Sequence, residues 1–78
     1  MLTNPHLRSE ITTILSEDIG ILAEVVFDET LETLGLDETR LSRFWAGKFI
    51  RELDKNLPQD IEHRQPIIRR VADVLMKA

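Results

Sequence analysis

Seventy-eight residues are enough for one domain, which we expect to span residues 1–78. Fourteen acidic and 10 basic residues give a net charge of -4, which argues against a protein that coats nucleic acid. The chain has no cysteine, which excludes disulfides, thiolate metal sites and cysteine nucleophiles. Its apolar runs are too short to cross a bilayer, and its first residues lack a signal-peptide pattern. We therefore expect a cytoplasmic protein with no membrane partner.

The first predicted helix begins at Pro5, because proline suits the first helical position, where its missing amide hydrogen had no partner. The apolar phase then shifts at Asp18 and Gly20, which favours a break with Asp18 capping a second helix. One bent helix over residues 5–34 is the alternative. Before the shift, four aliphatic residues at helical spacing predict a buried stripe: Leu7, Ile11, Ile14 and Leu15.

The segment over residues 19–34 carries two apolar stripes, one more than an isolated surface helix needs. One stripe can face the core and the other a second copy, so we expect a homodimer, as suits so small a domain. The alternative is a helix surrounded on all sides within a monomeric bundle. The stripes contain Ile19, Ala23, Phe27 and Leu34 on one side, and Leu22, Val25 and Val26 on the other.

Gly35 is typical of a helix C-cap, and Asp37 of the next N-cap. A third helix is predicted over residues 38–56, ending before Pro58, and a short helical turn over residues 60–64. The apolar face of this third helix contains Leu41, Trp45, Phe49, Leu53 and Leu57, with Ala46 and Ile50 alongside.

A last helix is predicted to start at Pro66. No stretch of the chain alternates strictly between polar and apolar residues, so strands are not expected. The sequence predicts an all-α fold, a small bundle of four to five short helices. The buried stripe of the last helix contains Ile67, Ile68, Val71, Val74 and Leu75.

Charge is distributed unevenly along the chain. Residues 1–38 contain nine acidic residues and one basic residue, Arg8, whereas residues 39–78 contain five acidic and nine basic residues. Either the acidic second helix lies beside the basic third helix, where surface pairs contribute little stability, or one sign of charge is presented to a partner.

The third helix is the candidate binding surface. At about 100° per residue, its cations fall within roughly a quarter of the circumference, with Phe44 among them and almost opposite Phe49. Aromatic and arginine residues carry much of the energy at interfaces. This predicts a partner-binding surface, unless Phe44 is covered by the acidic half or exposed by chance. The predicted site contains Arg40, Phe44, Lys48, Arg51 and Lys55.

The alternative function is nucleic-acid binding by the same helix. Its cations would contact phosphates, and Phe44 would stack on a base or wedge between bases. The net charge of -4 and the nine carboxylates in the first half oppose this reading, so nucleic acid is not the expected partner.

Catalytic and metal-binding patterns are not found in the sequence. His6 and His63 lie at opposite ends of the chain, without the spacing of metal ligands. The chain has no glycine-rich phosphate loop and no nucleophile elbow. We therefore expect no enzyme activity, no metal and no cofactor.

The stretch IGILAEVV over residues 19–26 is followed by a helical segment and a proline-containing last helix. Over residues 15–77 this pattern resembles a small helical domain found at the C-termini of some bacterial regulatory proteins, a domain without an assigned biochemical activity. The resemblance implies a bacterial signalling or assembly adaptor with no catalytic residues. The expected function is thus a self-associating, non-catalytic protein-interaction module.

Overall fold

The computed structural model describes residues 6–58 and 64–77. Within these residues there is no β-strand, so the predicted all-α fold is confirmed. Two short 3₁₀ turns lie between the second and third of four α-helices. The elements are α1 (Leu7–Ile19), α2 (Leu22–Leu34), η1 (Glu38–Arg40), η2 (Arg43–Trp45), α3 (Ala46–Asn56) and α4 (Arg64–Lys77).

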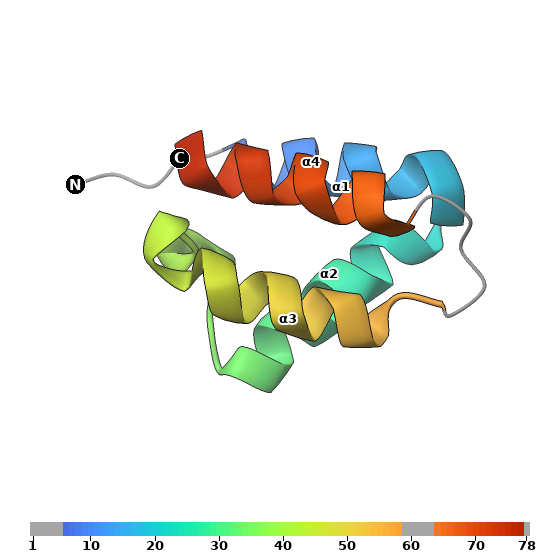
Figure 1. Ribbon diagram of the computed structural model, residues 1–78. Coiled ribbons are helices and arrows are strands. Elements are labelled where there is room, and N and C mark those ends of the chain that lie inside the picture. The colour runs from blue at the N-terminus through green and yellow to red at the C-terminus, as the bar shows by residue number, and fades with distance from the viewer. Residues whose placement is uncertain (1–5, 59–63, 78) are drawn as a thin grey trace.

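The four helices pack in a closed ring of contacts. α1 contacts α2 and α4, and α3 contacts the same two helices. Figure 1 shows α1 and α4 side by side along one edge of the molecule, with α2 and α3 crossing below them. The molecule measures 37 × 22 × 21 Å, and its long dimension runs roughly along α3 and α4.

The core takes side chains from all four helices. The predicted stripe of α1 is confirmed. Of the apolar face predicted for the third helix, five residues are buried, whereas Trp45 and Ile50 are half-buried; on α4 the stripe is buried at three positions and half-buried at two. Between α2 and α3, the Phe27 and Phe49 rings lie 5.7 Å apart, centroid to centroid, and tilted by 59°. Tilted pairs at this distance are a favourable aromatic geometry, so these two rings anchor the α2–α3 contact.

The predicted break between the first two helices is confirmed at Gly20. Its φ of 57° lies in the left-handed region that favours glycine, and its amide donates to the Ser16 carbonyl at 3.0 Å. The predicted cap by Asp18 is wrong, because Asp18 lies within α1 and the N-cap of α2 is Ile21. Gly20 supplies the turn instead, its carbonyl accepting from the Ala23 amide at 3.1 Å.

The end of α2 follows the predicted glycine cap. Gly35 has φ 68° and donates its amide to the Glu32 carbonyl, while the Leu36 amide reaches back to the Leu31 carbonyl at 2.9 Å. These two bonds define a Schellman motif, which satisfies carbonyls at the helix end. Asp37 then caps the next turn by accepting from the Thr39 amide, as the sequence predicts.

The predicted helix over residues 38–56 is wrong in its first eight residues. Extended backbone at Leu41 and Ser42 separates η1 from η2, and the α-helix begins only at Ala46. The physical reason is local capping: the Ser42 side chain accepts from the Phe44 amide, which starts a new turn there. Burial of Leu41 fixes the extended segment against the core.

The last helix begins at Arg64, two residues before Pro66. Proline is tolerated in the first turn of a helix, so it does not define the start. Leu57 ends α3, as predicted. The predictions for Pro5 and for most of the turn over residues 60–64 lie outside the described residues.

One buried polar contact joins α2 to α3. The Thr30 hydroxyl is fully buried, donates to the Val26 carbonyl at 2.8 Å and accepts from the Asn56 side-chain amide at 3.0 Å. A buried hydroxyl without a partner is costly, so this bond favours one register of the two helices.

Candidate interaction surfaces

Phe44 is the most exposed aromatic side chain of the described residues, at 85%. It lies in η2, immediately before α3, where the Ser42 cap and the core contacts of η2 with α3 and α4 hold the turn. The prediction that Phe44 points away from the core is therefore confirmed, although the turn that places it is not the predicted α-helix. Within the described residues, the acidic half of the chain does not cover it.

Trp45 gives the Phe44 ring a defined setting. Trp45 lies edge-on to it with ring centroids 5.9 Å apart, and the Lys48 ammonium lies 5.3 Å from the Trp45 ring centroid. That distance is within the range of a cation–π contact. Trp45 is itself half-buried against the core, so it connects the exposed ring to the packed interior.

Three of the predicted cations share the outer face of α3. Lys48, Arg51 and Lys55 are exposed and lie opposite the buried residues Phe49 and Leu53 on the helix. We call Phe44, Lys48, Arg51 and Lys55 the aromatic–basic surface. Arg40 is exposed but lies in η1, before the extended segment, so helical spacing does not place it on this surface.

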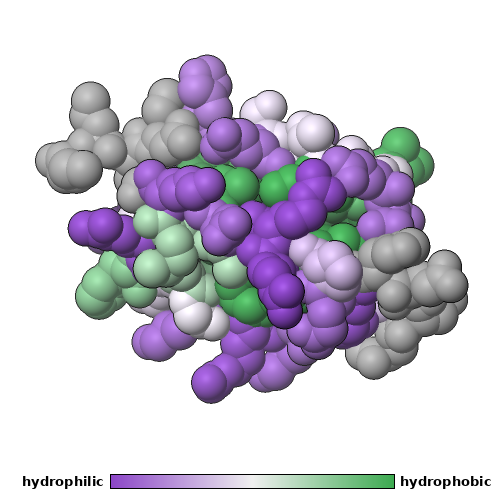
Figure 2. Space-filling view, turned by 45° about the horizontal axis from the view of Figure 1, so that its top comes forward, coloured by the Kyte–Doolittle hydropathy of each residue, from purple (hydrophilic) through white to green (hydrophobic). Residues whose placement is uncertain are grey.

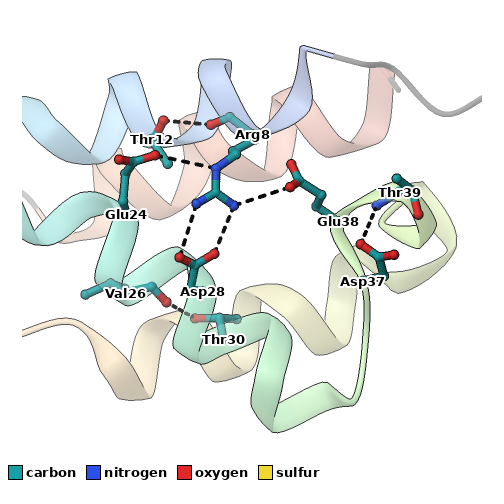
Figure 3. A network of polar contacts seen from close by, with 9 residues as sticks. All are labelled: Arg8, Thr12, Glu24, Val26, Asp28, Thr30, Asp37, Glu38 and Thr39. Atoms are coloured by element: carbon teal, nitrogen blue, oxygen red, sulfur yellow. Dashed lines mark hydrogen bonds and ion pairs between the residues drawn. The ribbon is translucent and has the colours of Figure 1, made fainter.

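The acidic half of the chain neutralises its own single cation. Arg8 of α1 makes a bidentate pair with Asp28, at 2.9 and 3.1 Å, and its guanidinium also lies 3.4 Å from Glu24 and 3.7 Å from Glu38 (Figure 3). It stacks 5.2 Å from the Phe27 ring centroid. The hydrogen bond to Asp28 is the main reason that the pKa of Arg8 is raised.

An ion pair between described residues crosses from one half of the chain to the other. Arg70 of α4 donates to both Glu17 carboxylate oxygens, at 2.7 and 3.1 Å. This hydrogen bond, with the attraction of the opposite charges, lowers the pKa of Glu17 and raises that of Arg70. It joins the last turn of α1 to the middle of α4 across the surface.

The acidic second helix and the basic third helix pack together without pairing their charges. Over the described residues, no ion pair joins α2 to α3. Lys55 pairs within its own helix, with Glu52 at 3.4 Å. Glu29 and Glu32 are exposed on α2, and Arg51 on α3. Local balance between these two helices therefore does not explain the uneven charge.

The second apolar stripe of α2 divides into a buried and an exposed part. Val26 is buried, whereas Leu22 is 49% and Val25 50% exposed, so α2 is not surrounded on all sides. Ile21, just before the helix, is 94% exposed. Apolar spacing does not single out Ile21, because the two stripes assume that helical phase continues through the Gly20 turn. The phase shift at Gly20 is the signal that could have revealed it.

The described residues contain no group of three histidine, aspartate or glutamate side chains that could hold a metal ion. His63 lies outside the described residues. None of the helices in the described part of the chain has both the length and the apolar character needed to span a membrane.

The fold and surfaces define a small all-α protein with an exposed aromatic–basic surface and exposed aliphatic residues at the start of α2. No protein-family model, curated protein or solved structure matches the chain. The resemblance to a C-terminal domain of bacterial regulatory proteins therefore stays a prediction.

Proposed function

We propose that this chain is a small, non-catalytic protein-interaction module of the adaptor or regulatory kind, and that it binds partners through the aromatic–basic surface. The single observation that carries the proposal is the exposed Phe44 ring, held edge-on to a half-buried Trp45. Exposing a large aromatic ring to water is unfavourable, and rings anchored in this way are common centres of binding energy.

The chemistry of the surface indicates the chemistry of the partner. Lys48 and Arg51 have no carboxylate partner within the described residues, so their charge remains available. A protein surface with an apolar spot beside carboxylates would match both the ring and the cations. Such a surface would bind faster at low salt, because its charges steer the encounter.

Capture from a lysate with matched variants tests this function. The wild-type chain, Phe44→Ala and Arg69→Ala would be immobilised and their bound proteins compared. Arg69 is also exposed, but it lies in the first half of α4, which begins at the opposite end of the molecule from the start of α3 (Figure 1), so its variant is the control. We expect Phe44→Ala alone to lose a specific partner, with affinity weakened by more than about 1 kcal/mol. Identical capture by all three proteins would contradict the proposal.

The second candidate, nucleic-acid binding, uses the same side chains. Exposed Lys48 and Arg51 beside an aromatic ring are also the elements of a single-strand binding surface. Fluorescence polarisation with mixed-sequence DNA and RNA at low salt separates the two. Phosphate contacts are strongest there, so a flat titration eliminates this candidate. Binding that Lys48→Glu abolishes would replace the proposed function.

A further inference from the structure

Three aliphatic side chains are exposed together at the corner between α1 and α2. Ile21 forms the tip of the turn, and Leu22 and Val25 follow it on the first turn of α2. The Gly20 backbone reverses the chain here, so it turns these side chains outward. Scattered single apolar residues are common on surfaces, but three neighbours on so small a chain form a patch.

Carboxylates continue the same face of α2. At about 100° per residue, Leu22, Val25, Glu29 and Glu32 fall within roughly a quarter of the helix circumference. Glu29 and Glu32 are exposed and make no ion pair within the described residues. α2 contains no basic residue. We call Ile21, Leu22, Val25, Glu29 and Glu32 the acidic–apolar surface.

The acidic–apolar and aromatic–basic surfaces begin at opposite ends of the molecule. In Figure 1, α2 starts at the right and α3 starts at the left, at the two ends of the long dimension. Figure 2 shows hydrophobic side chains at both ends, in green at the upper right and in paler green at the left. One copy therefore cannot bring its own Ile21 and Phe44 together.

We propose that the acidic–apolar surface of one copy binds the aromatic–basic surface of a second copy. This inference rests on the proposed function, since it names the partner of the same surface. Each surface offers an apolar spot beside charges of one sign, and the two signs are opposite. Contact between them removes Val25 and Phe44 from water and places Glu29 and Glu32 near cations.

Charge also disfavours the two symmetric alternatives, in which each surface binds the same surface of the second copy. Two acidic–apolar surfaces in contact would place the Glu29 and Glu32 carboxylates of both copies together. Two aromatic–basic surfaces in contact would place the Lys48 and Arg51 cations of both copies together. Like charges brought together across an interface oppose binding, so the head-to-tail contact is favoured. Such a contact leaves one surface of each kind free in every pair, which allows further copies to add.

Complementation between two variants tests this arrangement. Val25→Arg blocks the acidic–apolar surface, and Phe44→Glu blocks the aromatic–basic surface; both residues are exposed, so the fold should persist, as circular dichroism would check. Sedimentation of the wild type should show mass rising above 9.0 kDa with concentration and falling back with added salt. Each variant alone should remain at 9.0 kDa, and Arg69→Glu, a charge change at an exposed position of α4 outside both surfaces, should behave as the wild type.

An equimolar mixture of the two variants is the decisive sample. Each retains the surface that the other lacks, so the mixture should form a one-to-one pair that does not grow further. With Val25→Arg isotopically labelled, its amide signals should shift around residues 44–51 and not around residues 21–32. A mixture that stays monomeric, or a Phe44→Glu variant that still self-associates, would overturn the inference.

The inference and the proposed function can fail separately. A wild-type chain that stays at 9.0 kDa up to about 1 mM would overturn self-association. Selective loss of a captured protein by Phe44→Ala would still support the interaction module, bound then to a different protein. Conversely, self-association without any other captured partner would support the head-to-tail contact alone.

Discussion

The inner and outer faces of α2 and α3 differ in how completely their side chains are partnered. On the inner faces, Phe27 and Phe49 pack against each other, and Thr30 is hydrogen-bonded to Asn56. On the outer faces, aliphatic and charged side chains meet water, and no ion pair joins the two helices over the described residues. Stability is therefore concentrated on one side of each helix, which leaves the other side able to serve binding.

The largest expected effect separates two phenylalanines five residues apart. Phe49→Ala should lower the free energy of unfolding by about 3–5 kcal/mol, because it opens a cavity beside Phe27. Phe44→Ala should change it by less than about 0.5 kcal/mol, because the ring is 85% exposed. Urea denaturation of both variants beside the wild type measures the difference.

The same measurement can break the comparison. If Phe44→Ala destabilised the protein as strongly as Phe49→Ala, the ring would be buried in solution, and the aromatic–basic surface would be part of the interior. A stable Phe44→Ala variant with intact helical circular dichroism makes that variant a clean probe of binding.

Much of the fold could be predicted because apolar spacing and glycine caps are local signals. The α1 stripe, the turn at Gly20 and the cap at Gly35 each follow from a few neighbouring residues. The start of α3 could not be predicted in this way. Helical spacing continues through residues 38–45, but capping by Asp37 and Ser42 and burial of Leu41 divide that stretch into two short turns.

The candidate surfaces were predictable only in part for the same reason. Lys48, Arg51 and Lys55 lie on one regular helix, so spacing alone places them together. Arg40 lies before the extended segment, where helical spacing no longer applies. Exposure of Ile21 depends on the direction of the chain after Gly20; the shift in apolar phase indicates a turn there but not the direction that the chain then takes.

The Arg8 network is expected to have an intermediate effect. Arg8→Ala should lower the free energy of unfolding by about 1–2 kcal/mol, because it removes a bidentate pair and leaves neighbouring carboxylates uncompensated. Arg8→Met retains much of the aliphatic stem over Phe27, so it separates packing from charge. Denaturation of Arg8→Ala and Arg8→Met at low and high salt measures how much packing and how much charge contribute to the free energy of unfolding.

Arg69 supplies the control for that prediction. It is exposed on α4 and makes no ion pair within the described residues, so Arg69→Ala should leave stability within about 0.5 kcal/mol. An equal loss in Arg8→Ala and Arg69→Ala would mean that net charge, and not the Arg8 contacts, determines the change. A loss confined to Arg8→Ala places the effect in the α1–α2–η1 contact.

The smallest expected effect is the acid response of the Glu17–Arg70 pair. Arg70 lowers the pKa of Glu17 below its ordinary value of 4.5, so this pair stabilises the fold above that pH. The contribution is lost as the pH falls through the lower, folded-state pKa, where protonation of Glu17 ends its charge. Carboxyl NMR titration should therefore find the pKa of Glu17 below 4.5 in the wild type and raised toward 4.5 in Arg70→Gln.

Salt provides the control for this prediction. Both side chains are half-exposed, so added salt should narrow the difference in Glu17 pKa between the wild type and Arg70→Gln. An unchanged Glu17 pKa in Arg70→Gln would show that the pair does not persist in solution, and the packed apolar stripes of α1 and α4 would then hold these helices together without it.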